Sequence, residues 1–399
     1  MNFSFFKKKK EYVLMHGNNE VLQFVYDNGF DKITEIKHSE DLPLGTSKAG
    51  RPSLKLLNEW FKERVLPPTR YNSEHICASL SVSCIEDLYL SDHARSLSDT
   101  FWIKEKSEKT IWNDVYNAPF DDKAFFLAQF TNEPVKESAR TTPNNMTSGN
   151  SPKAWMKENG TCFLYKGATD PFQISTVNEW LSFQIGQLLD MNVMPYSLSV
   201  YKDIPLSVSA CMCNDHTDFV SAQQILSFYN SSQAYQLQFN TYVSILKQRG
   251  IENVEKKLSD MFVVDYLLIN TNRKPSNMGV LINTATGKWM DIMPIFDNGD
   301  SLGCHLSHEA LKECPQTSKY QLFNATDISF EELFPFIRFD EYDFSRLTEL
   351  PQKYGEELVR LQPYTNISDQ RIEEQYTLFY KRILSLTKAA KHLKKAKHF

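Results

Sequence analysis

Two polar side chains at either end of an apolar hairpin could together hold one divalent ion. Asn277 closes a short polar loop, and Asp297 follows the second apolar strand of a hairpin that turns around Thr286-Gly287. Hard oxygen ligands of this kind suit magnesium, which keeps several waters and takes one or two protein carboxylates plus phosphate oxygens. Kinases place a metal-binding Asn and a metal-binding Asp in this order in the chain. The spacing therefore predicts a nucleotide and metal site.

The longer stretch from Asp265 to Leu302 resembles the C-lobe signature of HipA-like kinases. That signature reads Asn-Thr-Asp-Arg-His, then an Asn, a hairpin, and Phe-Asp-Asn-Gly-x-Ser-Leu. The positions that match it are Asn270, Thr271, Arg273, Asn277, Gly279, Phe296, Asp297, Asn298, Gly299, Ser301 and Leu302. The resemblance implies a two-lobed fold, protein-kinase-like and phosphatidylinositol-kinase-like, that binds ATP and Mg²⁺ with Asn277 and Asp297 as metal ligands.

Two positions of this stretch depart from the signature. Asn272 stands where the family has its catalytic Asp, and Lys274 stands where it has His. A catalytic Asp accepts or orients the proton of the attacking hydroxyl, whereas an amide has no basic oxygen at neutral pH. The resemblance then implies that Asn272 orients the hydroxyl without deprotonating it, and that Arg273 and Lys274 neutralise developing charge.

These departures leave two functions open. The first is an ATP- and magnesium-dependent kinase that phosphorylates a protein Ser or Thr, slowed by the missing carboxylate. The second is a pseudokinase, a nucleotide-binding module that regulates a partner as part of a toxin–antitoxin system or a mobile element.

A loop of small residues, 147–153, precedes a second hairpin that turns at Asn159-Gly160. The backbone N–H groups of such a loop can approach phosphate oxygens closely, while a solvated loop is the alternative. In HipA-like kinases a phosphate loop, a nucleotide Lys and a helix Glu precede the catalytic loop in this order. By this resemblance, Lys166 contacts the nucleotide and Glu179 anchors Lys166. The loop residues assigned to the nucleotide are Ser148, Gly149, Ser151 and Lys153.

The composition of the 399-residue chain is that of an ordinary soluble protein, with 41% hydrophobic and 23% charged residues. A net charge of −5 argues against a broad nucleic-acid-binding surface. Seven scattered cysteines are typical of reduced thiols in a cytosolic protein. No stretch reaches the roughly twenty apolar residues of a membrane span. We therefore expect a cytoplasmic protein without membrane contact, whose partner is a protein substrate or a regulatory protein.

The first part of the chain carries the signals of a hairpin and a helix. Apolar and polar residues alternate between positions 12 and 26 around a Gly-Asn-Asn turn, and a helical pattern runs from Ser53 to Arg64. The run LNEWFKERVLPPTR at 57–70 resembles the N-terminal region of a bacterial subgroup of HipA-like proteins, some of which carry the label excisionase. We expect an accessory module at residues 1–130.

The remaining patterns separate a β-rich part from a helical part. Strand patterns continue to residue 213, where residues 211–215 are expected to cross between lobes. Helical periodicity then predicts helices at 221–228, 234–249, 254–269, 329–338, 344–361 and 368–399. Residues 300–324 lack periodicity and are expected to form a loop in the place of an activation loop. The fold prediction is α+β, with a small nucleotide-binding lobe at 131–214 and a helical C-lobe at 215–399.

Two charged features have alternative explanations. Asp265 lies on an apolar helix face just before the catalytic loop, where it could bond to Arg273 and the loop backbone, or replace the missing base. The basic run at 388–398 ends the last helix. Such a run favours its own helix dipole and is usually a solvated face, with nucleic acid or an acidic partner as the alternative contact.

Overall fold

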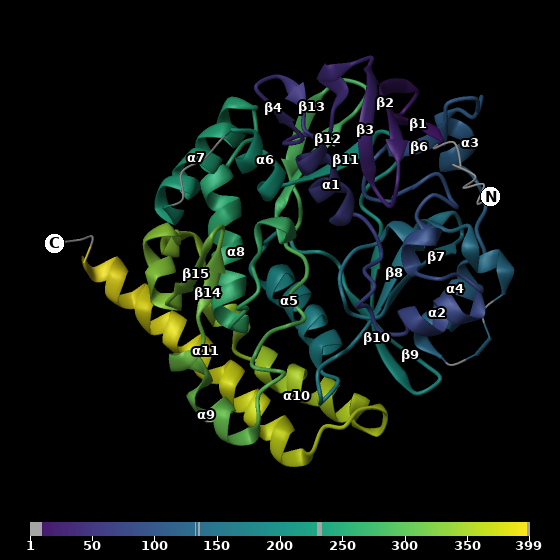
Figure 1. The fold of residues 1–399 in the computed structure, drawn as a ribbon. Coiled ribbons are helices and arrows are strands. Elements are labelled where there is room, and N and C mark those ends of the chain that lie inside the picture. The colour runs from purple at the N-terminus through teal and green to yellow at the C-terminus, as the bar shows by residue number, and fades with distance from the viewer. Residues whose placement is uncertain (1–9, 132, 135, 230–233, 397–399) are drawn as a thin grey trace.

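The structure is a computed structural model that describes residues 10–131, 133–134, 136–229 and 234–396. A part rich in strands lies on the right in Figure 1, and a helical part lies on the left. The molecule therefore has the two-lobed α+β arrangement that the sequence predicts. None of the helices in these described ranges combines the length and the apolar content of a membrane span.

The first sheet is built from the N-terminal hairpin. It contains β1 (Glu11–His16), β2 (Asn19–Tyr26), β3 (Phe30–Ile36) and β6 (Phe101–Glu105), in the antiparallel order β3-β2-β1-β6. The other elements of this part are β4 (Ser47–Lys48), β5 (Arg51–Pro52), α1 (Leu54–Lys62), α2 (Ser73–Ser79), α3 (Trp112–Tyr116) and α4 (Asp122–Phe130). Helix α1 begins after Ser53 because the Ser53 side chain accepts a hydrogen bond from the Leu56 N–H.

The second sheet carries the predicted nucleotide lysine. Its strands are β7 (Lys153–Glu158), β8 (Thr161–Gly167), β9 (Ser197–Tyr201) and β10 (Ile204–Ala210), in the antiparallel order β7-β8-β10-β9. The β7–β8 turn is tight because Asn159 and Gly160 both have positive φ, +49° and +87°, which Asn-Gly adopts readily. Helix α5 (Ser175–Leu188) follows β8 and packs on this sheet.

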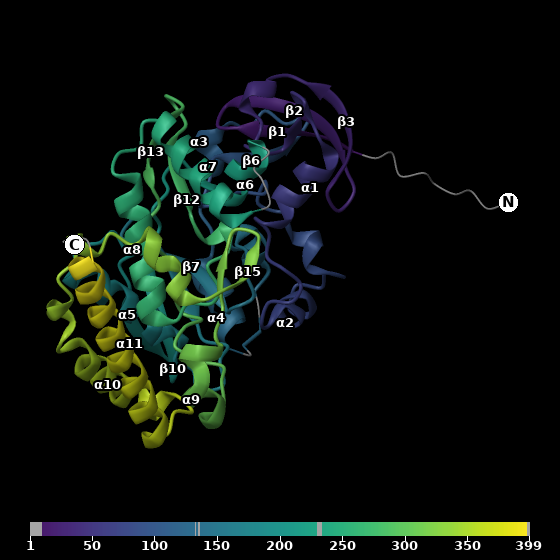
Figure 2. The same ribbon diagram turned by 90° about the vertical axis from the view of Figure 1, so that its left-hand side faces the viewer.

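The third sheet joins the strand-rich part to the helices. It consists of β11 (Thr217–Ser221), β12 (Gly279–Asn283) and β13 (Lys288–Ile292), in that order. The helical part contains α6 (Ala222–Phe228), α7 (Tyr235–Gln248), α8 (Val254–Leu268), α9 (His308–Thr317), α10 (Leu350–Leu361) and α11 (Asp369–Ala396), with a small hairpin of β14 (Tyr320–Leu322) and β15 (Ala325–Ile328). Figure 2, turned by 90°, shows α10 and α11 together at the lower edge of this part.

Two large apolar cores hold the molecule together, and neither follows the predicted domain limits. One core joins the N-terminal sheet to the second sheet, because Ala154 of β7 and Leu206 of β10 belong to the same buried cluster as Leu14 and Phe24. The other core fills the helical part and includes the buried face of α5. The part predicted as an accessory module is therefore continuous in packing with the second sheet.

Three predicted segments differ from the structure. Residues 300–324, expected to be a loop, contain α9 and β14, whose Cys314 and Tyr320 are buried. The segment predicted as a helix at 329–338 is a 3₁₀ helix, Phe330–Phe336, because Pro335 lacks the N–H that an α-helix would require. The helix predicted at 344–361 is divided into a 3₁₀ turn, Phe344–Leu347, and α10. The last three residues of the predicted final helix lie outside the described residues.

Candidate nucleotide and metal site

Asn277 and Asp297 meet where the β12–β13 hairpin returns the chain to the loop after α8. We call residues 270–278 the Asn277 loop and residues 293–302 the Asp297 loop. Asn277 Nδ2 donates a hydrogen bond of 2.7 Å to Asp297 Oδ2. The structure thus brings the two predicted metal ligands together.

The backbone is left-handed at Asp297 and again at Ile269, just before the Asn277 loop. Asp297 has φ +57°, a left-handed conformation that a short polar side chain tolerates. Ile269, the C-cap residue that follows α8, has φ +50°, and a left-handed backbone at a β-branched residue is an outlier. Such outliers cluster at functional sites, where the surrounding structure holds them.

Lys166 connects the second sheet to the Asp297 loop. Its Nζ lies 2.6 Å from Glu179 Oε1 of α5 and 2.7 Å from Asp297 Oδ1. Burial alone would lower the pKa of Lys166, but the Asp297 and Glu179 carboxylates outweigh burial and hold this pKa well above its ordinary value. The Lys166 ammonium in turn holds the pKa of Asp297 below its ordinary value. Both groups are therefore charged at neutral pH.

Gly299 permits the close approach of the Asp297 loop to α5. A Cβ atom at this position would lie 2.9 Å from the Ser175 carbonyl oxygen. Asn178 of α5 fixes the same loop, since its Nδ2 donates to Gly299 O at 3.1 Å and to Ser301 O at 3.0 Å. A side chain at position 299 would push the loop away from α5, and Asp297 away from Lys166.

Arg273 is fully buried and ties three segments together. Its Nε and Nη2 donate to Asp265 of α8 at 3.0 and 2.8 Å. Nη1 donates to Asn277 O at 3.0 Å and to Phe296 O at 2.7 Å, and Nη2 also donates to Asn298 Oδ1 at 2.5 Å. Because every donor is used inside the protein, the prediction that Arg273 neutralises charge on a substrate is wrong. Arg273 instead holds the Asn277 and Asp297 loops against α8.

Asp265 is the buried partner of this arginine. Its Oδ1 accepts from Asn270 Nδ2 and Arg273 Nη2, and its Oδ2 accepts from Arg273 Nε and the Tyr320 hydroxyl. Asp265 is not exposed to solvent. It therefore has the scaffold role, and the alternative of a substitute base is excluded. Tyr320 went unnoticed in the sequence because it lies in the segment expected to be a loop.

Asn272 and Lys274 are the predicted catalytic residues that stay accessible. The Asn272 N–H donates to Asn270 Oδ1 at 3.0 Å, and within the described residues its half-buried side chain has no hydrogen-bond partner. Lys274 is exposed and pairs with no carboxylate of the described ranges. Their roles toward a substrate stay predictions.

The predicted phosphate loop precedes β7 and faces Lys153. Ser148 and Gly149 are exposed, and Ser151 is half-buried. Gly149 has φ +90°, and a Cβ atom there would lie 2.7 Å from Lys153 Nζ. Lys153 stands opposite Lys166 in the β7–β8 register. The two lysines and the loop therefore share one region of the molecule.

Arg70 is a residue of this region that sequence reasoning missed. Its Nε donates to Gly149 O and its Nη2 to Ser148 O, both at 2.8 Å, with a further bond from Nη2 to Thr147 O. Only 2% of Arg70 is exposed. Burial lowers the pKa of Arg70 to about 9. The sequence marks Arg70 only as the last residue of the Pro-Pro-Thr-Arg run. It does not indicate which loop Arg70 binds, because that loop is far away in the sequence.

Replacing Arg70 with Met is expected to free the loop and to weaken ATP binding roughly tenfold to a hundredfold, since bonds from a charged donor contribute about 1.5 to 3 kcal/mol. Hydrogen exchange at residues 147–150 and calorimetric ATP titration measure the two effects. Arg64→Met is the matched control, because Arg64 pairs with Asp99 in the same N-terminal part and does not touch the loop. Equal loop exchange in both variants would contradict the assignment.

Lys153 predicts a pH dependence of nucleotide affinity. Burial, with Lys166 and Arg70 nearby, lowers the pKa of Lys153 to about 7. Phosphate oxygens favour the protonated amine, so ATP affinity is expected to fall as pH rises from about 6 to about 8 and Lys153 loses its proton. Titrations in that range measure this decrease, and Lys153→Met is expected to remove it. A dependence that survives in Lys153→Met would assign the proton to another group.

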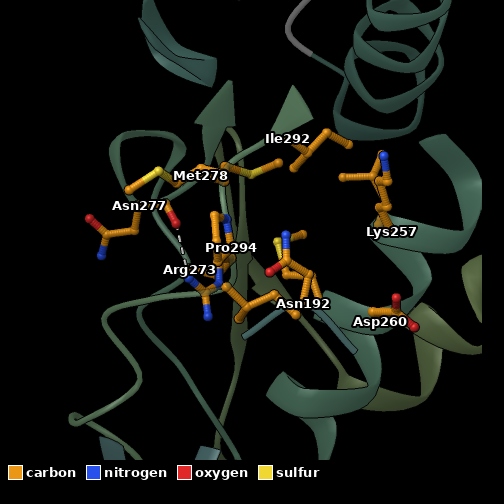
Figure 3. A pocket seen from close by; sticks show the side chains of 12 residues that line it. Asn192, Lys257, Asp260, Arg273, Asn277, Met278, Ile292 and Pro294 are labelled. Carbon is orange, nitrogen blue, oxygen red and sulfur yellow. Dashed lines mark hydrogen bonds between the residues drawn. The ribbon is translucent and has the colours of Figure 1, made fainter. Parts of the chain in front are cut away.

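A small cavity lies behind the Asn277 loop (Figure 3). Arg273 and Asn277 line one end, and Lys257 and Asp260 of α8 line the other. Its volume of about 30 Å³ suffices for roughly one water molecule. The cavity therefore belongs to the packing behind the site and cannot receive a nucleotide.

Comparison with known proteins places this geometry in a known fold. No family model and no curated protein matches the chain. Among solved structures, HipA in the HipA, HipB and operator DNA complex of a Shewanella oneidensis MR-1 toxin–antitoxin system is 13% identical, with a TM-score of 0.52. The match covers 93% of this chain and 96% of that one. The chain has the fold of HipA.

The HipA-like, kinase-like fold predicted from the sequence is thus confirmed. A second solved structure, the proinflammatory kinase CtkA of Helicobacter pylori, is 18% identical with a TM-score of 0.47. That match covers 61% of this chain and 95% of CtkA. At these identities the likeness to HipA concerns the fold, and the roles of individual site residues stay predictions.

Proposed function

We propose that this protein binds ATP and Mg²⁺ and transfers phosphoryl groups slowly to a protein Ser or Thr. One observation carries the proposal: Lys166 bridges Glu179 and Asp297 while Asn277 bonds to the other oxygen of Asp297. A lysine aimed by a helix glutamate, next to an Asn and Asp pair, is the set with which kinases position phosphates and metal. The HipA fold supports the same conclusion.

The residues of the site fit a magnesium nucleotide. Asp297 supplies an ionised carboxylate, and Asn277 supplies an amide oxygen, the hard donors that Mg²⁺ prefers. Lys166 is a charged donor for the α- and β-phosphates. Lys153 and the N–H groups of the loop at Ser148, Gly149 and Ser151 would hold the remaining phosphate oxygens. When bound, Mg²⁺ neutralises charge on the phosphates and on the leaving group.

Asn272 would orient the hydroxyl of the acceptor, with Lys274 beside it as an exposed cation. The missing carboxylate is the observation that favours a second function, a nucleotide-responsive regulatory module. The two functions differ in turnover and share the same nucleotide site.

A regulatory protein is the partner we propose, in a toxin–antitoxin setting and in the cytoplasm. The support is the HipA fold, since the matched HipA was solved in complex with HipB and operator DNA. The net charge of −5 favours a protein over a nucleic acid as the direct partner of this chain.

Calorimetric and thermal-shift titrations with ATP, with and without Mg²⁺, test the nucleotide site. Asp297→Ala is expected to abolish the magnesium-dependent part of binding. Lys166→Met keeps the aliphatic stem and is expected to lose roughly tenfold to a hundredfold in affinity, as a charge-assisted contact of about 1.5 to 3 kcal/mol implies. Glu179→Gln should lose less, and its effect should not add to that of Lys166→Met because the two residues act as a pair.

Lys257→Met is the matched control, because it breaks a partly exposed ion pair with Asp291 outside the site. Its ATP affinity should equal that of the parent protein. Unchanged ATP binding in both Asp297→Ala and Lys166→Met would place the nucleotide elsewhere and sink the proposal.

A further inference from the structure

The outer face of α11 carries a continuous line of exposed side chains, which we call the α11 stripe. Its members follow one another at intervals of three or four positions and so lie on one face of the helix. They are Asp369, Glu373, Tyr376, Tyr380, Leu384, Lys388 and Lys391. Figures 1 and 2 show α11 at the outer edge of the helical part.

The middle of the α11 stripe is apolar and unusually open to solvent. Tyr376 is 38% exposed, Tyr380 41% and Leu384 51%. The two tyrosine rings are stacked nearly parallel, with centroids 6.3 Å apart, and both side chains are open to solvent. Exposed aromatic side chains gathered in this way are enriched at protein interfaces.

The two ends of the α11 stripe have opposite charge. Asp369 and Glu373 stand at the N-terminal end, and Lys388 and Lys391 at the C-terminal end. Asp369 accepts a hydrogen bond from the neutral Gln362 side chain. Within the described ranges, none of these four charges takes part in an ion pair.

A hollow of about 630 Å³ lies beside the acidic end, between α10 and α11. Val359 of α10, 55% exposed, and Tyr376 form its apolar walls, and Glu356 adds a third carboxylate to the acidic rim. This hollow suits a segment that is both basic and apolar. The C-terminal end of α11 is such a segment, because Lys388 and Lys391 share one helix face with Leu384, which is 51% exposed.

We propose that the α11 stripe is the interface of a symmetric dimer in which two copies of α11 pack antiparallel. Three pairs of stripe residues have the same midpoint in the sequence, position 382. The pairs are Tyr380 with Leu384, Tyr376 with Lys388, and Glu373 with Lys391. A two-fold axis at that position therefore brings all three pairs together at once, as a self-complementary interface requires.

In this dimer, each lysine end meets the acidic end of the other copy, and the aromatic middle is covered. Lys388 faces the Tyr376 ring, a favourable cation–π pairing. The basic end of one copy enters the hollow between α10 and α11 of the other. Nucleic acid is a poorer occupant, because a phosphate backbone along the stripe would meet Asp369 and Glu373. A single helix pair is a small interface, below about 1,200 Å² in total, so the dimer should dissociate on dilution.

Sedimentation velocity over a concentration series tests the dimer. The parent protein is expected to shift from monomer to dimer as concentration rises. Glu373→Lys and Lys391→Glu should each be monomeric, since each places like charges opposite one another at both ends of the interface. An equimolar mixture of the two variants should dimerise again. The first variant carries lysine at both positions and the second carries glutamate at both, so opposite charges meet at each end of the mixed dimer.

Two further variants complete the design. Lys288→Glu changes an exposed lysine of β13, remote from α11, and should dimerise as the parent does. Leu384→Asp should be monomeric alone, when mixed with Glu373→Lys, and when mixed with Lys391→Glu. Its helical circular dichroism signal should equal that of the parent. A parent that stays monomeric throughout, or a mixture of Glu373→Lys and Lys391→Glu that fails to associate, would overturn the proposal. The proposal would also be overturned if the parent is monomeric and binds duplex DNA, and if Lys391→Glu removes that binding. The basic end of α11 would then be assigned to nucleic acid.

Discussion

Asn272→Asp is expected to raise the rate of phosphoryl transfer by about 10²- to 10⁴-fold, the range that general-base help contributes. The reason is chemical: the carboxylate accepts the proton of the attacking hydroxyl, whereas the amide only orients the hydroxyl. Nothing in the structure opposes the change, because within the described residues the Asn272 side chain has no partner that a carboxylate would lose. Autophosphorylation with labelled ATP and Mg²⁺, compared with the parent, measures the effect.

Two controls separate catalysis from binding. ATP affinity should be nearly equal in the parent and in Asn272→Asp, since Lys166 and Asp297 are untouched. The double variant Asn272→Asp with Asp297→Ala should be inactive, because the metal site is lost. Equal transfer rates in Asn272→Asp and the parent would show that position 272 does not face the acceptor hydroxyl.

Arg273→Met should cost about 3 to 5 kcal/mol of unfolding free energy, the usual loss when one partner of a buried ion pair is removed. The buried Asp265 carboxylate would lose its guanidinium partner, while Asn277 O and Phe296 O would lose their donor. Urea denaturation followed by circular dichroism measures the loss. The same change should weaken ATP binding, because the Asn277 and Asp297 loops are no longer held to α8.

Arg360→Met is the matched control for this variant. Its partner is Glu357, one helical turn away in α10, and half of the Arg360 side chain is exposed. Such a surface pair contributes roughly 0 to 1 kcal/mol. If Arg273→Met does not fold, Arg273→Lys keeps one charge without the planar fork and should lie between the two. A loss in Arg273→Met as small as that of Arg360→Met would contradict the buried network.

Local patterns in the sequence predicted much of the fold. The hairpins around Asn159-Gly160 and Thr286-Gly287 were predicted from turn residues, and α8 was predicted from the spacing of its apolar side chains. These signals work because turn conformation and helix periodicity depend on residues close together in the chain. The HipA-like fold was predicted from motif order, which local propensity alone does not supply.

Contacts between distant segments were the part that the sequence did not reveal. Arg70 binds a loop nearly eighty residues further along, with the Gly149 bond spanning 79 positions. Tyr320 reaches Asp265 across 55 positions from a segment without periodicity. Arg273 was assigned to the substrate because its neighbour, Asn272, is a predicted catalytic residue. A cation at that position can face either the substrate or the protein interior. Only the packing shows that this one points into the protein.

During synthesis on the ribosome, the N-terminal part cannot close its core when residue 130 emerges. It must wait for Ala154 and Leu206, which belong to the same buried cluster. The second carboxylate partner of Lys166 is made later still, because Asp297 lies 131 positions further on. At a synthesis rate of roughly 5 to 20 residues per second, this interval lasts roughly 7 to 26 s. The nucleotide site is thus completed late in translation, and a truncated or stalled nascent chain would carry the lysine without the residues that complete its site.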